Sequence, residues 1–266
     1  MRGWWEETKV DKFSVLFLFL GLFLIALVCI TLGNMFYKQI MDIPTFISVI
    51  KDPVVINAIW ISISATTFST LVAFFFGVPL AYFLARNDFW GKSMMEGILD
   101  IPMMIPHVVA GIALYAVFNR SGVIGAPLKT LGIIFQDDFP GVVVAMLFMS
   151  FPYVVNTAKE GFKTIDPRLE NVACSLGASR WKAFLKITFP LAFPSIFNGM
   201  LQCWARGISE FSAILILAYF PRSAPILIYE WFTTFGLGVS RPISVLLILI
   251  CLAIFALSRL PKWKRQ

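Results

Sequence analysis

The sequence predicts an all-α membrane protein that crosses a lipid bilayer six times. Hydrophobic residues make up 59% of its 266 residues and charged residues only 14%, whereas a soluble domain usually carries about a quarter charged residues. The apolar residues gather in six runs of about the 20 residues that a helix needs to span the hydrocarbon core. The net charge of +7 comes mainly from basic residues between these runs, which is typical of membrane loops rather than of a nucleic-acid-binding surface.

The expected spans follow one another along a single transmembrane domain, residues 13–260. The first run lacks the small-x-small cleavage site of a signal peptide and is therefore kept as a span. Gly77 and Pro79 mark a kink in the second span. Pro102 and Pro106 are expected to bend the third, because proline frees backbone carbonyl groups in a helix. In chain order, the spans cover residues 13–32, 59–84, 97–118, 141–158, 191–219 and 242–260.

The distribution of basic residues sets the expected orientation. With both termini in the cytoplasm, fifteen of the 22 Lys and Arg residues lie on the cytoplasmic side and six on the outer side, which satisfies the positive-inside rule. Residues 1–12 and 261–266 are then cytoplasmic segments, and residues 159–190 form a cytoplasmic loop. The expected location is the plasma membrane, which the chain crosses several times.

The cytoplasmic loop carries the longest charged interruption of the apolar sequence. Pro167 and Glu170 favour a helix start, since carboxylates are favourable at the N-terminal end of the helix dipole. Gly177 can adopt the left-handed conformation that ends a helix, and Ser179 can cap the next one. That second helix, residues 180–186, places basic residues on one face and large apolar residues on the other. The loop is therefore predicted to form a rigid elbow on which a soluble partner docks.

This arrangement resembles the EAA loop of ABC importer permeases. In that motif a Gly follows the EAA triplet after three residues, and an Ile-x-Leu-Pro segment follows the Gly after nine more. Here Gly177, Ile187 and Pro190 stand at the matching spacing. Phe189 takes the place of the Leu, and Ala173 matches the second Ala.

The sequence departs from the motif at Asn171 and Val172, which stand where the family has Glu and Ala. Glu170, one residue earlier, is the remaining candidate for the acid. The resemblance implies that separate ABC ATPase subunits, which carry ATP and Mg, dock on the elbow. The residues expected to contact them are Glu170, Asn171, Ala173, Gly177, Ala178, Ser179, Arg180 and Trp181.

Two further segments resemble the molybdate and tungstate branch of these permeases. They are WARGISEF at residues 204–211 and AYFPRSAPILIYE at residues 218–230. Sulfate permeases carry similar segments, so the resemblance indicates an oxyanion more strongly than a particular one. It also implies a type I ABC importer fold, an extracytoplasmic oxyanion-binding protein and a second permease copy. A homodimer is the simplest form of that assembly.

Charged residues within the fifth span mark a second candidate site. Arg206 and Glu210 are four residues apart, so they are expected to share a helix face and neutralise each other. An unpaired charge at the bilayer centre costs at least about 2.5 kcal/mol, so the pair must face protein or water. It either lines the solute pathway or a gate, together with Ser209, or fixes the packing of helices.

The chain contains no recognisable catalytic machinery of its own. The nearest approach to a phosphate-binding loop, RNDFWGKS at residues 86–93, has Arg where the first Gly is required. The four cysteines lack metal-ligand spacing, so neither a metal site nor a cofactor is expected in this chain. We therefore expect a non-catalytic permease subunit. The alternative is an ion-coupled secondary transporter or channel that uses Arg206, Glu210 and His107.

Overall fold

The computed structural model describes residues 12–259, and the regular secondary structure of this part of the chain is helical. The all-α fold predicted from the sequence is confirmed. The predicted terminal segments lie almost wholly outside the described residues. The elements are α1 (Lys12–Ile40), α2 (Ile43–Ile50), α3 (Pro53–Arg86), α4 (Lys92–Met104), α5 (His107–Phe118), α6 (Gly125–Thr130), α7 (Phe139–Lys163), α8 (Arg168–Ser175), α9 (Arg180–Ala183), the π-helix η1 (Phe184–Thr188), α10 (Phe189–Ile208), α11 (Ser212–Leu217), α12 (Ala224–Phe235) and α13 (Leu237–Arg259).

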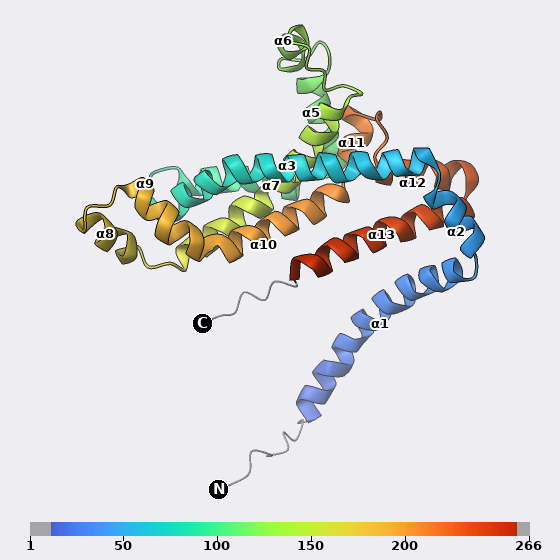
Figure 1. The fold of residues 1–266 in the computed structure, drawn as a ribbon, viewed down its shortest axis with the longest axis horizontal. Coiled ribbons are helices and arrows are strands. Elements are labelled where there is room, and N and C mark those ends of the chain that lie inside the picture. The colour runs from blue at the N-terminus through green and yellow to red at the C-terminus, as the bar shows by residue number, and fades with distance from the viewer. Residues whose placement is uncertain (1–11, 260–266) are drawn as a thin grey trace.

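Three long helices, α3, α7 and α10, lie side by side and form the core of a bundle (Figure 1). Leu84, Phe162 and Ile196, one from each helix, are buried together in this core. Small residues bring the helix backbones close: a Cβ atom added to Gly199 would lie 3.1 Å from the carbonyl oxygen of Tyr153. Such close packing stabilises helix pairs in a bilayer, where apolar lipid tails remove the hydrophobic drive for association.

The third expected span is broken rather than bent. Residues 97–118 are divided between α4 and α5, whose axes differ by 109°. Pro106 is the cause, because its ring disfavours the helical conformation of the preceding residue. Ile105 is accordingly extended, with φ −77° and ψ 146°. The prolines thus have the predicted location, but their effect is much larger than a kink.

The fifth expected span also differs from the structure. A continuous helical rod begins at Arg180, passes through η1 and ends at Ile208, whereas the sequence predicted a span over residues 191–219. The chain leaves the helix at Ser209, and Phe211 adopts φ −125° and ψ −54° before α11 begins. The rod therefore starts inside the predicted cytoplasmic loop and ends before Glu210.

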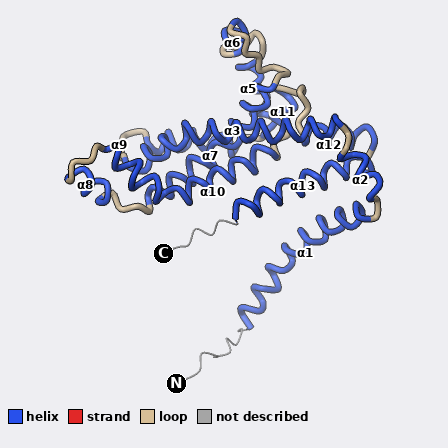
Figure 2. The backbone as a smooth tube through the Cα atoms, in the orientation of Figure 1, coloured by secondary structure: helices blue, strands red, loops and turns tan. Residues whose placement is uncertain are grey.

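The two breaks produce an arm that projects from the side of the bundle. α5 packs against α11, and a Cβ atom added to Gly111 of α5 would lie 3.0 Å from the Cα atom of Ala213. Figure 1 shows α5, α6 and α11 extending away from the axis of α3 and α7. The tube in Figure 2 shows that loops connect these short helices. The arm therefore joins two segments that are about a hundred residues apart in sequence.

The remaining helices lie at the periphery of the bundle. α1 diverges from α13 and ends at Ile40, eight residues beyond the expected boundary at Leu32. Across the described residues, five helices are long and apolar enough to cross a membrane, or six if α4 and α5 together count as one span. Their exposed apolar side chains suit a hydrocarbon environment, and the chain is a multi-pass membrane protein.

Candidate functional site

The elbow predicted around Gly177 is formed by α8 and α9. Gly177 has a φ of +90°, which L-amino acids with side chains rarely adopt. Its N–H donates to the carbonyl oxygen of Cys174 at 3.0 Å, and the N–H of Ala178 donates to that of Ala173 at 3.0 Å. This pair of hydrogen bonds is the Schellman motif, which satisfies the last carbonyl groups of a helix. Gly177 therefore ends α8 as the sequence predicted.

The second half of the elbow is continuous with a membrane-spanning helix. The Oγ atom of Ser179 accepts a hydrogen bond from the N–H of Lys182 at 3.3 Å and so caps α9, as predicted. From Arg180 the chain runs without a helix break through η1 into α10. The elbow is therefore connected to the bundle core by one continuous helix.

Glu170 attaches the elbow to α3. Its Oε2 atom accepts a hydrogen bond from the hydroxyl of Tyr82 at 2.6 Å, and its Oε1 atom accepts one from Thr188 at 2.8 Å. Arg86 forms an ion pair with Oε1, with its Nη2 atom 2.9 Å away and its Nε atom 3.0 Å away. Arg86 also donates to the carbonyl oxygen of Ile165 at 3.0 Å. One carboxylate thus joins α8, α3 and η1.

The surroundings of Glu170 favour its charged form. Partial burial opposes ionisation, but hydrogen bonds from Tyr82, Thr188 and Arg86, together with the charge of Arg86, outweigh it and lower the pKa of Glu170. Its side chain is 15% exposed and points toward its partners within the chain. Glu170 therefore holds the elbow in place, and Asn171 beside it is exposed instead.

The other residues predicted for docking lie around the turn of the elbow, where Asn171, Arg180 and Trp181 also line a pocket. Ala173 and Ala178 are half-buried, and Trp181 is 69% exposed although its ring stacks on Phe184. The remaining residues are exposed: Asn171, Gly177, Ser179 and Arg180. The outer side of the elbow is therefore available to a partner.

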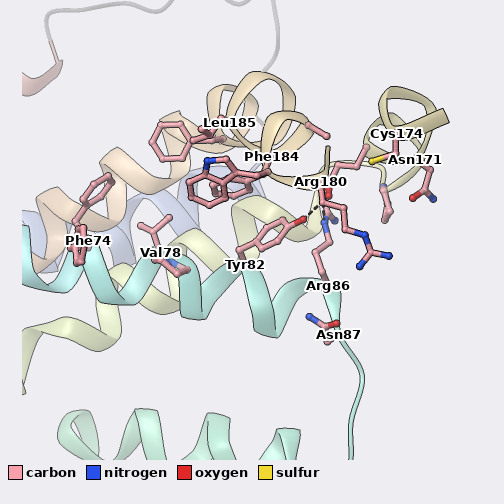
Figure 3. A pocket seen from close by; sticks show the side chains of 17 residues that line it. Phe74, Val78, Tyr82, Arg86, Asn87, Asn171, Cys174, Arg180, Phe184 and Leu185 are labelled. Carbon is pink, nitrogen blue, oxygen red and sulfur yellow. Dashed lines mark hydrogen bonds and ion pairs between the residues drawn. The ribbon is translucent and has the colours of Figure 1, made fainter. Parts of the chain in front are cut away.

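A pocket of about 700 Å³ lies behind the elbow, between α3, α8 and the start of the rod. Figure 3 shows Phe74 and Val78 at one end and Arg86, Asn87 and Arg180 at the other. The pocket is therefore apolar toward the middle of α3 and polar toward its C-terminal end. No local sequence pattern indicates this pocket, because its walls come from segments about a hundred residues apart.

The charged residues predicted at the second site do come together, at the base of the arm. The Oε2 atom of Glu210 lies 3.1 Å from Nη2 of Arg206 and 3.1 Å from Nδ1 of His107. Nη2 of Arg206 also lies 2.6 Å from Nε2 of His107. Glu210 lies outside the helix that contains Arg206, yet the ion pair expected from their spacing is present. Nη1 of Arg206 lies 3.4 Å from the hydroxyl of Ser209.

Glu210 is fully buried in this cluster, whereas the side chains of Arg206 and His107 are 20% and 41% exposed. Its Oε1 atom accepts a hydrogen bond from the backbone N–H of Ala213 at 3.0 Å. This carboxylate therefore links the end of α10, the start of α5 and the start of α11. The cluster fixes the geometry at both helix breaks.

The model of the family described as "Binding-protein-dependent transport system inner membrane component" matches residues 77–260, which include the elbow, the arm and the rod. The chain belongs to this family. It is a permease subunit, and ATP hydrolysis is the task of another subunit.

Several curated relatives of the permease cover nearly its whole length. The molybdate/tungstate transport system permease protein WtpB of Thermococcus kodakarensis is 46% identical over 94% of this chain and 96% of its own length. The WtpB protein of Pyrococcus abyssi is 43% identical over 94% and 95%. A probable sulfate transport system permease protein of Chlorokybus atmophyticus is 35% identical over 86% and 78%.

Solved structures of ABC importers share the fold of the permease. A chain of a bacterial alginate ABC transporter in complex with a pentasaccharide-bound periplasmic protein has a TM-score of 0.72 at 19% identity, over 92% of this chain and 91% of its own. A chain of the MetNI methionine transporter has a TM-score of 0.61 at 16% identity, over 77% and 93%. The type I importer fold expected from the resemblance is confirmed.

The structure also shows polar residues of the permease that the sequence did not single out. Asn156 on α7 donates to Asp100 on α4 at 2.7 Å, and Lys159 on α7 forms an ion pair with Glu96 on α4 at 3.1 Å. Asn156 and Lys159 are three residues apart on α7, and Glu96 and Asp100 are four residues apart on α4. The two residues on each helix therefore lie on one helix face. The spacing can be read from the sequence, but nothing in the sequence indicates that these two helix faces meet.

Proposed function

We propose that this permease imports an oxyanion, most specifically molybdate or tungstate, with energy from separate ABC ATPase subunits. The elbow carries this proposal, because a rigid turn with an exposed outer side is joined without a break to a rod in the bundle core. The relatives named as molybdate/tungstate permeases, at 43–46% identity, support the solute. The weaker similarity to sulfate permeases supports the oxyanion class as a whole.

The elbow geometry suggests how the chain converts a partner's motion into transport. ATP and Mg on the docked ATPase subunits supply the energy. The docking residues of the elbow, Asn171 and Gly177 to Trp181, receive the displacement. Glu170 transmits it to α3 through Tyr82 and Arg86, while η1 transmits it to α10. Both helices then move relative to the arm and open the pathway on alternate sides of the membrane.

The cluster at the base of the arm has two separate roles in this proposal. Arg206 and Ser209 are accessible enough to meet an anion in the pathway. Glu210 is fully buried and would repel an anion, so it positions Arg206 and the two helix breaks. Transient contact with one partly neutralised Arg suits a passage, where tight binding would slow release.

A second, identical permease chain completes the proposed pathway, and an extracytoplasmic oxyanion-binding protein delivers the solute. The most apolar stretch of α1 buries none of its residues against the rest of the described chain, so it is available for contact with the second copy. The proposed location is the plasma membrane, with both termini and the elbow on the cytoplasmic side, as the distribution of basic residues indicates.

The variant Gly177→Glu tests whether the ATPase docks on the elbow. The position has open space around it but a φ of +90°, so the variant adds a charge and local strain at the docking surface. We expect normal membrane insertion, loss of ATPase pull-down and at least a tenfold fall in molybdate-stimulated ATP hydrolysis in vesicles that also hold the ATPase and the binding protein.

Gly132→Glu is the matched control. Gly132 has a φ of +82° and equally open surroundings, but it lies in the loop after α6, far from the elbow in sequence. The control should retain both activities. Wild-type ATPase binding by the Gly177 variant would contradict docking at the elbow. Proton-driven uptake in vesicles without an ATPase would instead support the ion-coupled alternative through His107, Arg206 and Glu210, which the family membership does not favour.

A further inference from the structure

The pocket behind the elbow has the composition of a site for an amphiphilic ligand. Its volume of about 700 Å³ falls in the ~300–1,000 Å³ range of pockets that bind small molecules. Most of its lining is aromatic or aliphatic, whereas charged and amide groups gather at the end next to the last turn of α3 (Figure 3). A ligand that fits it must therefore carry a polar group at one end and an apolar chain at the other.

The polar end of the pocket holds an excess of positive charge. The charges of Arg86 and Glu170 neutralise each other in their ion pair. Arg180 also lines this end, and among the described residues its side chain has no hydrogen-bond or ion-pair partner. The exposed amide of Asn171 stands on the same wall and can donate as well. An anionic oxygen group, such as a phosphodiester, complements this end.

The apolar end of the pocket continues into the surface that faces the lipid. Phe75 lines the pocket and is 70% exposed, and Leu71, one helical turn earlier on α3, is 52% exposed. An acyl chain can therefore pass from the bilayer along α3 into the pocket without crossing a polar surface. α3 is long and apolar enough to span a membrane and ends with Arg86, and basic residues are common at the ends of such spans, near the phospholipid headgroups.

We propose that this pocket binds an anionic phospholipid, with the phosphodiester at Arg180 and Asn171 and one acyl chain against Phe75 and Val78. Basic pockets at the cytoplasmic end of membrane helices suit such headgroups. The bound lipid fills the space between the elbow and α3, and so supports the elbow from behind. This site shares Asn171, Arg180 and Trp181 with the residues proposed for docking, so lipid binding is tested in the complex with the ATPase. It does not depend on which solute the permease transports.

The tryptophan in the pocket wall provides a direct measurement. Full-length permease, assembled with its ATPase, is reconstituted in phosphatidylcholine nanodiscs that contain a small fraction of brominated phosphatidylglycerol or brominated phosphatidylcholine. Bromine quenches nearby tryptophan fluorescence, and a parallel Trp181→Phe sample isolates the signal of Trp181 from that of the other tryptophans. We expect saturable quenching of Trp181 by the anionic lipid at a fraction at which the zwitterionic lipid has little effect.

Two matched variants test whether the charge of Arg180 selects the anionic lipid. Arg180→Gln should weaken the preference for the anionic lipid about fivefold, the contribution typical of one basic residue near an anionic membrane surface. Lys182→Gln removes a neighbouring charge of α9 that does not line this pocket, so it should leave the preference within about twofold of wild type. Equal effects of the two variants would show general surface attraction and overturn the proposal.

Two further outcomes also decide against the site. If glycerol phosphate in solution displaces the brominated lipid at low concentration, the ligand is a free phosphate and the apolar end contributes nothing. If Trp181 is quenched by neither lipid in the assembled complex, a protein partner fills the pocket. Displacement only by other anionic phospholipids supports the proposal.

Discussion

At the scale of single residues, Glu170 shows how much of the elbow depends on one side chain. It stands beside the position where the related motif has its acid, and the sequence suggested that it contacts the ATPase. In the structure it binds Tyr82, Arg86 and Thr188 instead. Its role is therefore to hold α8 against α3, so its loss should affect the attachment of the elbow before it affects docking chemistry.

Glu170→Gln should loosen the elbow by about 1–3 kcal/mol, because Arg86 then loses the charge that compensates its partial burial. We expect faster hydrogen exchange in residues 168–177 and a higher ratio of ATP hydrolysed to solute transported. The control is Glu160→Gln, since Glu160 forms an exposed pair with Lys163 and such pairs contribute ~0–1 kcal/mol.

The pH dependence of hydrogen exchange in wild type and Glu170→Gln distinguishes the contribution of the charge of Glu170 from that of its packing. The pKa of Glu170 is lowered in the folded protein, so its stabilising effect is complete above the pKa of Glu in an unfolded chain, ~4.3. It is lost as the pH falls through the lower folded pKa. Wild-type protein and Glu170→Gln should thus exchange at different rates at neutral pH and converge in acid. A difference that persists in acid would argue that packing, not charge, holds the elbow.

A double-mutant cycle measures how much the ion pair between Arg206 and Glu210 contributes to stability. Arg206→Met leaves the fully buried Glu210 without its main counter-charge, which should cost about 3–5 kcal/mol of stability. Adding Glu210→Met removes the uncompensated charge and should restore much of the stability.

Thermal unfolding and transport are measured on the same four proteins of that cycle. We expect the double variant to regain both stability and transport, because the ion pair mainly holds the two helix breaks in their geometry. A double variant that is stable but inactive would show instead that Arg206 acts on the solute itself.

At the scale of helices, the structure separates what a sequence pattern can predict from what it cannot. The apolar runs at residues 59–84 and 141–158 fall within α3 and α7, which are single continuous helices. Pro102 and Pro106 predicted a bend, because the loss of an N–H is local to the chain. The 109° break could not be predicted, since its direction depends on the packing of α5 against α11, a distant segment.

The same limit applies to the candidate site. Gly177 and Ser179 were predictable, because a helix cap involves only neighbouring residues. The contact of Tyr82 with Glu170 joins positions 88 residues apart, and nothing near either residue indicates the other. The end of the fifth span differs from the prediction for a related reason. Ser209 to Phe211 contain no Gly or Pro that would indicate a helix end, but Glu210 contacts His107 and Ala213 outside the helix.

The polar contacts between α4 and α7 should contribute substantially to the stability of the folded bundle. Lys159 is 8% exposed and forms its ion pair with Glu96, whose side chain is 28% exposed. Lys159→Met should lower the unfolding temperature by several degrees, whereas Lys163→Met at the exposed pair should have little effect. Exchanging the two residues, as Glu96→Lys with Lys159→Glu, should restore part of the loss. Failure of the exchange to improve on the single variant would show that the pair is not the stabilising contact.

At the scale of the whole molecule, the elbow and the loop before α6 should face opposite sides of the membrane. Leu176 at the elbow is 84% exposed and Val123 in that loop is 85% exposed, so they form a matched pair of labelling positions. In a variant without the four native cysteines, Leu176→Cys should react with an impermeant maleimide only from the cytoplasm and Val123→Cys only from outside. Labelling of both from one side would contradict the proposed orientation.

The unbroken helix from Arg180 to Ile208 has a mechanical consequence. At about 1.5 Å per residue its 29 residues form a lever roughly 43 Å long. Tilting it by only ~5° about the elbow would sweep its far end, which carries Arg206, along an arc of roughly 4 Å. That arc is about the width of a side chain, so a small rotation at the elbow would be enough to move Arg206 by one side-chain width at the other end of the helix.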